Sequence, residues 1–265
     1  MQDCLYKLLF NRSARQALKV NQHGYFGVSI DQFDALQTID LDELDRTARK
    51  IASNMMFGNS GGGGGLRASY PMTIGYIEQE GVPILDMAFQ FLESEAFREY
   101  KEIPFDGMGL CAEESFYDFL VTSPLFLKGH VSQFVAQHEM LKALISLLTI
   151  HDRPNFEVRK SEVQHNGACK FALASYPHEI VEQLGYPQLM PARNSSVFLL
   201  YAATKTHYLQ GPVDNHMVEA LSYSVARYLS ETSEGEPKPV DPDFAAAWAV
   251  LEDRKLVLPC HIEGN

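Results

Sequence analysis

The chain opens with apolar residues spaced three and four positions apart, which is the spacing of an amphipathic helix. Polar residues suited to capping helix N-termini interrupt this pattern, at Asn11, Ser29 and Asp40. Asp42 and Glu43 follow Asp40, where the helix dipole favours acidic side chains. Residues 1–57 are therefore predicted to form a small module of three short helices.

A glycine-rich run separates this module from the next apolar segment. It reads Gly-Asn-Ser followed by five glycines and occupies residues 58–65. A phosphate-binding P-loop would end in Gly-Lys-Ser or Gly-Lys-Thr, whereas Leu66, Arg67 and Ala68 follow here. The run is predicted to be a flexible linker.

Residues 66–152 form a second stretch of helical spacing, divided by four prolines into segments of ordinary length. Its predicted helices cover Ile84–Tyr100, Glu114–Leu120 and Val131–Ile150. The last of these is the most apolar segment of the chain. Residues 66–152 are predicted to form a helical block.

The period changes from about four to two after residue 153. Phe156–Arg159 and Cys169–Ala174 alternate, while Ser196–Tyr201 is apolar on both faces and should be central in a sheet or completed by another chain. A helix over Val213–Leu229 is expected to pack on this sheet. Residues 153–230 are thus predicted to form a small antiparallel sheet with a packing helix, and the whole chain an α+β fold.

The last segment, residues 231–265, is rich in proline and acidic residues at its start and is predicted to be a linker and tail with one short helix, Phe244–Leu251. The longest apolar stretch, Met140–Ile150, is about half of the ~20 residues needed to cross a bilayer. The four cysteines lie far apart and form no Cys-x-x-Cys pair, and the N-terminus lacks the pattern of a secretory signal. A cytoplasmic, reduced protein is expected.

Charge narrows the choice of partners. The chain has 22 Lys and Arg against 34 Asp and Glu, a net charge of −12. Such a chain has no electrostatic reason to bind nucleic acid or an anionic membrane surface. Both are excluded as expected partners.

A search for catalytic or metal-binding motifs yields little. His138-Glu139 lacks the second histidine of a zinc-protease motif, because Lys142 stands at that position, and a pair on the helix surface is expected. His151 suits a helix C-terminus, and Cys260–Glu263 lies at the end of the chain. No nucleophile elbow or dinucleotide-binding glycine pattern occurs. The sequence predicts neither a metal nor a catalytic residue in this chain.

Aromatic residues gather in the helical segments, where most are expected to be core and some to bury surface against a partner. Three segments then show a resemblance. These are the motif Arg67-Ala68-Ser69-Tyr70-Pro71, the helix that follows over Leu85–Phe97, and the motif Phe116-Tyr117-Asp118-Phe119-Leu120. Together with the strand and helix pattern of residues 197–229, they resemble the partner proteins of multinuclear non-haem iron-dependent oxidative enzymes. Such pairs modify ribosomally made peptides, as in the methanobactin and thiaglutamate pathways. Residues 5–51 also look like a small helical module of protocatechuate dioxygenase alpha chains.

The resemblance implies a non-catalytic subunit that forms a heterodimer with an iron enzyme and presents a precursor peptide for cysteine modification. Iron is then expected on the enzyme and no cofactor on this chain. A sheet edge can bind an extended peptide as an added strand. The expected edge lies in Phe156–Val163 and Ser196–Tyr208, with contacts from the following residues: Phe156, Val158, Val197, Leu199, Tyr201 and Tyr208.

Arg67 and Tyr70 are expected to face the enzyme, although Arg67 could instead pair with an acid at a helix end. Two other hypotheses stay open. The first is a stand-alone, metal-dependent dioxygenase-like enzyme that uses His138, His151 or His207 as ligands. The second is a transcription-linked adaptor, which the negative charge disfavours.

Overall fold

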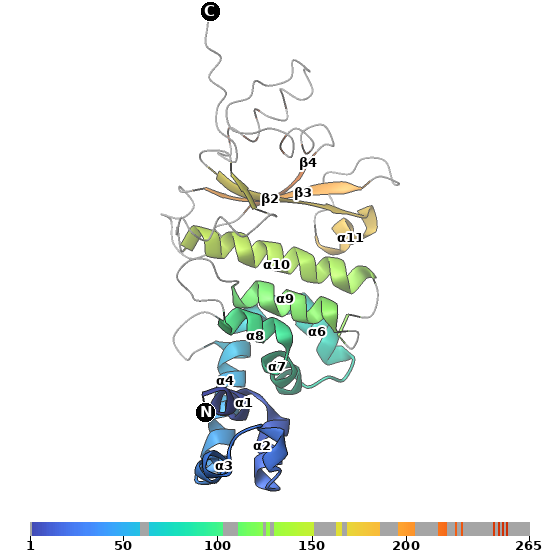
Figure 1. Cartoon of the computed structure of the whole chain (residues 1–265). Coiled ribbons are helices and arrows are strands. Elements are labelled where there is room, and N and C mark those ends of the chain that lie inside the picture. Colours follow the sequence, from blue (N-terminus) through green and yellow to red (C-terminus); the bar gives the residue numbers. More distant parts are fainter. Residues whose placement is uncertain are drawn as a thin grey trace, which may run out of the picture. The chain divides into compact units, whose positions relative to one another are not determined.

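The structure is a computed structural model. It describes residues 2–58, 64–102, 111–123, 126–127, 130–150, 163–165, 169–185, 196–204 and 217–221, with single positions between 226 and 253. The chain divides into two compact units, which are treated separately below. The first comprises Met1–Ile103 and Leu110–Lys128, and the second Pro104–Gly109 and Gly129–Asn265. Helices and one antiparallel sheet make this an α+β fold, as predicted (Figure 1).

The N-terminal part of the first unit is a helical module. Its elements are α1 (Gln2–Phe10), α2 (Arg12–Lys19), the short 3-10 helix η1 (His23–Tyr25), α3 (Ile30–Gln37) and α4 (Leu41–Phe57). The predicted caps are present. The side chain of Asn11 accepts a hydrogen bond from the Ala14 backbone N–H at 2.9 Å. Ser29 and Gln32 form a capping box, and Asp40 accepts bonds from the first turn of α4. These caps set where each helix begins.

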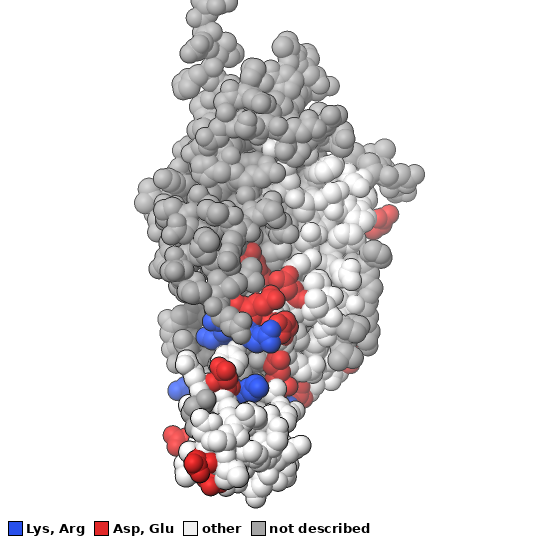
Figure 2. All heavy atoms as spheres, in the orientation of Figure 1, with Lys and Arg blue, Asp and Glu red and all other residues white. Residues whose placement is uncertain are grey.

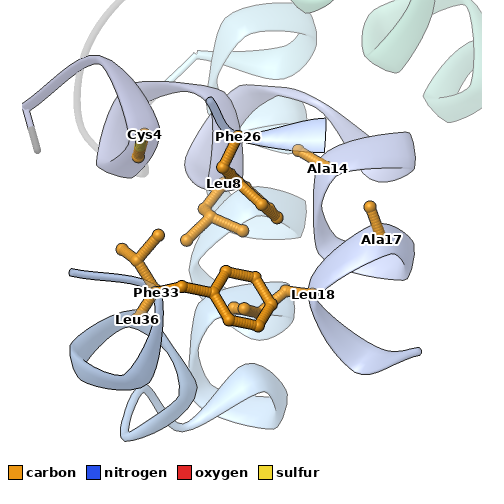
Figure 3. Packing of buried hydrophobic residues seen from close by; sticks show 8 residues of the cluster. All are labelled: Cys4, Leu8, Ala14, Ala17, Leu18, Phe26, Phe33 and Leu36. Carbon is orange, nitrogen blue, oxygen red and sulfur yellow. The ribbon is translucent and has the colours of Figure 1, made fainter. Parts of the chain in front are cut away.

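A cluster of buried apolar side chains holds this module together (Figure 3). The rings of Phe26 and Phe33 meet in it with centroids 5.8 Å apart. Leu8 and Leu36 complete the centre and are almost fully buried. Burying one such side chain stabilises a fold by about 1.5–3 kcal/mol, so this cluster supplies most of the module's stability.

The second part of the first unit contains five further helices. They are α5 (Gly65–Ser69), α6 (Pro71–Gln79), α7 (Ile84–Leu92), α8 (Glu95–Glu102) and α9 (Ala112–Thr122). The prediction of one helix over Ile84–Tyr100 is wrong, because the chain breaks at Ser94. The Ser94 hydroxyl donates to the Phe91 carbonyl at 2.6 Å and accepts from the Phe97 N–H at 3.2 Å. It therefore closes α7 and caps α8.

Aromatic rings form the core of these helices. Phe91 of α7 lies at its centre and contacts Phe97, Phe116 and Phe119 at centroid distances of 5.3, 5.2 and 5.4 Å. Edge-to-face and tilted pairs of this kind add to the energy of burial. The aromatic residues around Phe116 are thus core, as most were expected to be.

The two ends of the predicted linker pack against each other. Gly58 ends α4 with a φ of +76°, and Gly65 begins α5 with a φ of +57°. A Cβ atom on Gly65 would lie 2.5 Å from the Gly58 nitrogen. Residues 59–63 lie outside the described part of the chain. The prediction of a linker over 58–65 is wrong at Gly65, which belongs to a helix and touches the previous one.

The second unit contains a four-stranded antiparallel sheet and two helices. Its elements are α10 (His130–Ile150), β1 (Val163–His165), β2 (Cys169–Tyr176), α11 (His178–Gln183), β3 (Val197–Thr204) and β4 (Met217–Leu221). The strand order is β1-β2-β3-β4, and α10 packs across β2 and β3 (Figure 1). The helix that covers the sheet is therefore the end of the predicted block 66–152.

The prediction of a helix over Val213–Leu229 is wrong for its central part. Residues 217–221 form β4, which pairs with β3 so that Val218 lies opposite Tyr201. A strand that is apolar on both faces needs a neighbour on each side, and this tertiary demand overrides the local helical pattern. Ala226 and Leu229 are helical and buried. At the end of the chain, the described positions 246, 249 and 251 are helical, in agreement with the short helix Phe244–Leu251.

Candidate functional site

The side chains of β3 that were predicted to contact a peptide lie in the core instead. Tyr201 bonds to His138 of α10, so its face of the sheet is the one that α10 covers. Leu199 and Val197 occupy the same face, since side chains alternate along a strand. All three are at most 1% exposed. Their assignment as peptide-binding residues is wrong.

The sheet topology explains this error. β3 pairs with β2 on one side and with β4 on the other, so its backbone cannot accept an added strand. The prediction that this strand is central is confirmed. In the described part of the sheet the edges are β1 and β4. The other predicted peptide contacts, Phe156, Val158 and Tyr208, lie outside the described residues.

A buried chain of polar groups links α10 to the sheet. His138 Nδ1 and the Tyr201 hydroxyl are 2.8 Å apart, and the Tyr201 hydroxyl donates to that of Tyr176 at 2.9 Å. Because the single hydroxyl proton of Tyr201 is used in this bond, its oxygen accepts from a protonated Nδ1 of His138. The three groups form one directed chain that fixes the tautomer of the histidine.

This arrangement corrects the prediction for His138-Glu139. Both side chains are only 4% exposed, so they are not a pair on the helix surface. Burial of polar side chains is expensive unless they are hydrogen-bonded, which the tyrosines accomplish for His138. The sequence indicated His138 as unusual but did not identify Tyr176 or Tyr201 as its partners.

The described residues contain no group of three histidine, cysteine or acidic side chains that could hold a metal. Of the three proposed histidine ligands, His138 is engaged with Tyr201 through Nδ1. His151 and His207 lie outside the described ranges, as does the segment Cys260–Glu263. The geometry in hand therefore gives no support to a metal site at His138. Cys4 and Cys111 are buried free thiols.

Tyr70, predicted to face an enzyme, is buried in the first unit. It is 0% exposed and its hydroxyl donates to the Glu113 carbonyl at 2.6 Å. Its ring packs edge-on against Phe116 at 5.2 Å. The assignment of Tyr70 to an interface is wrong, because the side chain joins α5 and α6 to α9 within the core.

Removal of the Tyr70 hydroxyl is expected to weaken the isolated chain. Tyr70→Phe leaves the Glu113 carbonyl without its donor and should lower the free energy of unfolding by about 1–2 kcal/mol. Urea denaturation followed by circular dichroism measures this change. Tyr76→Phe, at a tyrosine that is 39% exposed, is the matched control and should change stability little. Equal stability of Tyr70→Phe and the unaltered chain would contradict the structural role.

Arg67, the other predicted interface residue, is half exposed. Its guanidinium pairs with Glu78 at 3.3 Å and lies 5.7 Å from the centroid of the Phe57 ring. The alternative that Arg67 pairs with an acid near a helix end is thus present in the structure. Phe57 is 41% exposed beside it. An enzyme-facing role for Arg67 stays a prediction.

A surface hollow of about 220 Å³ lies between α2 and the first turns of α4. Three cations and two carboxylates line it with two uncharged residues: Arg12, Arg15, Gln16, Lys19, Leu41, Asp42 and Asp45. The α2 residues recur at helical spacing and so form one face of that helix. In Figure 2, the described basic side chains gather among acidic ones, and much of the remaining described surface is uncharged.

Arg15 is the buried member of this hollow. Its side chain is 7% exposed, and Nη1 donates to the carbonyls of Leu8 and Leu9 at 2.9 and 3.1 Å. Nε donates to Asp45 at 3.1 Å. Burial lowers the pKa of Arg15, and the Asp45 carboxylate opposes this. Its Nη2 is buried without an acceptor in the described structure.

Asp45 links two arginines and makes stability depend on pH. Partial burial acts to raise its pKa, but the hydrogen bonds and charges of Arg49 and Arg15 outweigh burial and hold the pKa below the ordinary value of 3.8. The unfolded chain therefore binds the proton first as the pH falls. The stabilisation is complete above the ordinary pKa and is lost as the pH falls through the folded one.

Asp45→Asn is accordingly expected to flatten the pH dependence of stability between about pH 5 and pH 3. The urea midpoint, measured at several pH values in this range, reports the change. Asp31→Asn, at an exposed residue outside these ion pairs, is the control. A pH profile of Asp45→Asn with the same slope as that of the unaltered chain would contradict the linkage.

Among the helices that the structure describes, none is both long and apolar enough to span a bilayer. No family model, no curated protein and no solved structure matches the chain.

Proposed function

We propose that this chain is a non-catalytic partner subunit that binds a ribosomally made precursor peptide. It would present this peptide, for cysteine modification, to a multinuclear iron-dependent oxidative enzyme. The enzyme would carry the iron and form a heterodimer with this chain in the cytoplasm. The resemblance of Arg67–Pro71 and of the helices after it motivates the enzyme partner.

The observation that carries the peptide-binding part is the edge of the sheet in the second unit. β1, Val163–His165, pairs with β2, and no described strand lies on its other side. An edge strand presents unpaired backbone N–H and C=O groups, to which an extended peptide can add as a further strand. Val163 is the last residue of the originally expected edge segment, Phe156–Val163, so the proposal moves from β3 to β1.

A mostly filled core supports a binding role better than a catalytic one. The central strands and α10 enclose apolar side chains, with the His138–Tyr201–Tyr176 chain satisfied internally. Such a sheet is a rigid platform whose edge can hold an extended segment in a fixed register. The chemistry would then depend on the enzyme that receives the segment.

The test is a pull-down of the tagged full chain from its native cell extract. Metal content is measured on the eluate and on the chain purified alone, and co-purified peptides are identified by mass spectrometry. Recovery of an iron protein with a peptide, and no stoichiometric metal on this chain alone, is the expected result. A chain that carries its own stoichiometric metal would overturn the proposal in favour of the stand-alone enzyme.

A further inference from the structure

The hollow between α2 and α4 contains an incomplete arginine–carboxylate pair. Nε and Nη2 form one edge of the planar guanidinium of Arg15, and this edge commonly binds both oxygens of a carboxylate. Here Nε donates to Asp45 Oδ1 at 3.1 Å. The second oxygen, Oδ2, bonds instead to Arg49 Nε at 3.2 Å. Nη2 is therefore left without an acceptor on the side where Asp45 borders the hollow.

Leaving such a donor unsatisfied is costly for a folded protein. The guanidinium is always charged, and an unpaired buried N–H of a charged group loses its hydration without compensation. Arg15 cannot turn toward another acceptor, since Nη1 is held by the carbonyls of Leu8 and Leu9. An acceptor that enters the hollow would complete the bonding of Arg15.

Lys19 supplies a second positive charge at the same place. It lies one turn after Arg15 on α2, is exposed, and forms no ion pair with any described residue. Arg12 is already paired with Asp86 at 3.1 Å and stacks on Phe89, with its guanidinium carbon 3.8 Å from the ring centroid. The α2 side of the hollow thus offers Arg15 and Lys19 to an oxyanion.

The opposite rim selects among oxyanions. Asp42 lies there, and its carboxylate repels a bare anion but can accept a hydrogen bond from a peptide N–H. An acidic side chain within a peptide brings both groups, the carboxylate for α2 and the backbone N–H for Asp42. This combination favours a segment of polypeptide over a free ion.

We propose that the hollow between α2 and α4 binds an acidic side chain of a peptide segment, whose carboxylate is held by Arg15 and Lys19. This site belongs to the first unit and does not depend on the iron enzyme or on strand addition in the second unit. A carboxylate inserted between two cations is the kind of contact in which an arginine contributes strongly to affinity.

The experiment uses the isotope-labelled full chain and two probes. One is a blocked peptide containing Glu-Gly-Glu, and the other is its isosteric Gln-Gly-Gln counterpart. NMR titration follows the Arg15 Nε–H and the Lys19 amide. The expected result is a saturable shift of both signals with the acidic peptide and binding about tenfold weaker with the neutral one.

Lys19→Glu tests the site, and Lys50→Glu is its matched control. Both lysines are exposed and both changes alter the net charge equally, but Lys50 does not line the hollow. Lys19→Glu should reduce acidic-peptide binding about tenfold and Lys50→Glu less than about twofold. Circular dichroism checks that both variants fold.

Three results would overturn the proposal. Acetate or inorganic phosphate could shift the same signals as strongly as the acidic peptide does, which would make the hollow a site for small anions. The two lysine variants could lose binding equally, which would indicate general electrostatic attraction. The acidic peptide could leave the Arg15 signal unmoved, which would show that the hollow does not bind carboxylates.

Discussion

Replacement of Tyr201 by phenylalanine is expected to lower the free energy of unfolding of the second unit by about 2–4 kcal/mol. The change removes one oxygen but interrupts two hydrogen bonds, those to His138 and to Tyr176. Each buried group left without its partner costs about 1–3 kcal/mol. Because Tyr201 is 0% exposed, water is not expected to replace the lost bonds without rearrangement.

Hydrogen exchange followed by mass spectrometry, on peptides that cover α10 and β3, measures this loss in the unit concerned. Tyr25→Phe, at a tyrosine 38% exposed in the first unit, should leave exchange in α10 and β3 unchanged. The double change of Tyr201 and Tyr176 should cost less than the sum of the single changes, since both act on one chain of bonds. Additive effects would show that the hydroxyls act independently.

The sequence was most informative where structure is local. Asn11, Ser29 and Asp40 cap the helices that follow them, and each cap bonds to residues two or three positions ahead. Such bonds depend on short segments and can be recognised from residue type and spacing alone. The sequence therefore predicted the N-terminal helices and where they begin.

Some local signals were present but outweighed by a stronger pattern. The apolar stripe of Ile84–Tyr100 concealed the break at Ser94, although serine is a common N-cap. Likewise, a run of glycines indicated a linker, while the positive φ of Gly65 depends on how α5 meets α4. Composition could not distinguish a glycine required by packing from a glycine of a flexible loop.

The candidate sites depended on contacts between distant residues, and the sequence predicted these least well. His138 is 63 positions from Tyr201, and Tyr176 is 25 positions from it. The pairing of β3 with β4 decides that Val197, Leu199 and Tyr201 are core rather than an edge. Arg15 and Asp45 are 30 positions apart, so the hollow that they line has no motif. One sequence without its fold does not contain these distances.

The packing of Gly65 leads to the second large expected effect. Gly65→Ala should lower the free energy of unfolding of the first unit by about 3 kcal/mol, from two causes. Alanine at a φ of +57° is strained by roughly 1–2 kcal/mol. Its Cβ would also lie 2.5 Å from the Gly58 nitrogen and 2.8 Å from the Met55 carbonyl oxygen, and overpacking of this kind costs about 1–3 kcal/mol.

Gly81→Ala separates these two causes. Gly81 has a φ of +85°, but a Cβ there would meet nothing within 4 Å, so this variant retains the strain and lacks the collision. Urea denaturation of the full chain should show the larger loss for Gly65→Ala, and the difference between the variants measures the contact between α4 and α5. Equal losses would mean that this contact can yield at no cost. The residues around 58–65 would then act as the flexible linker that the glycines first indicated, and Gly65 would be required for its backbone angle alone.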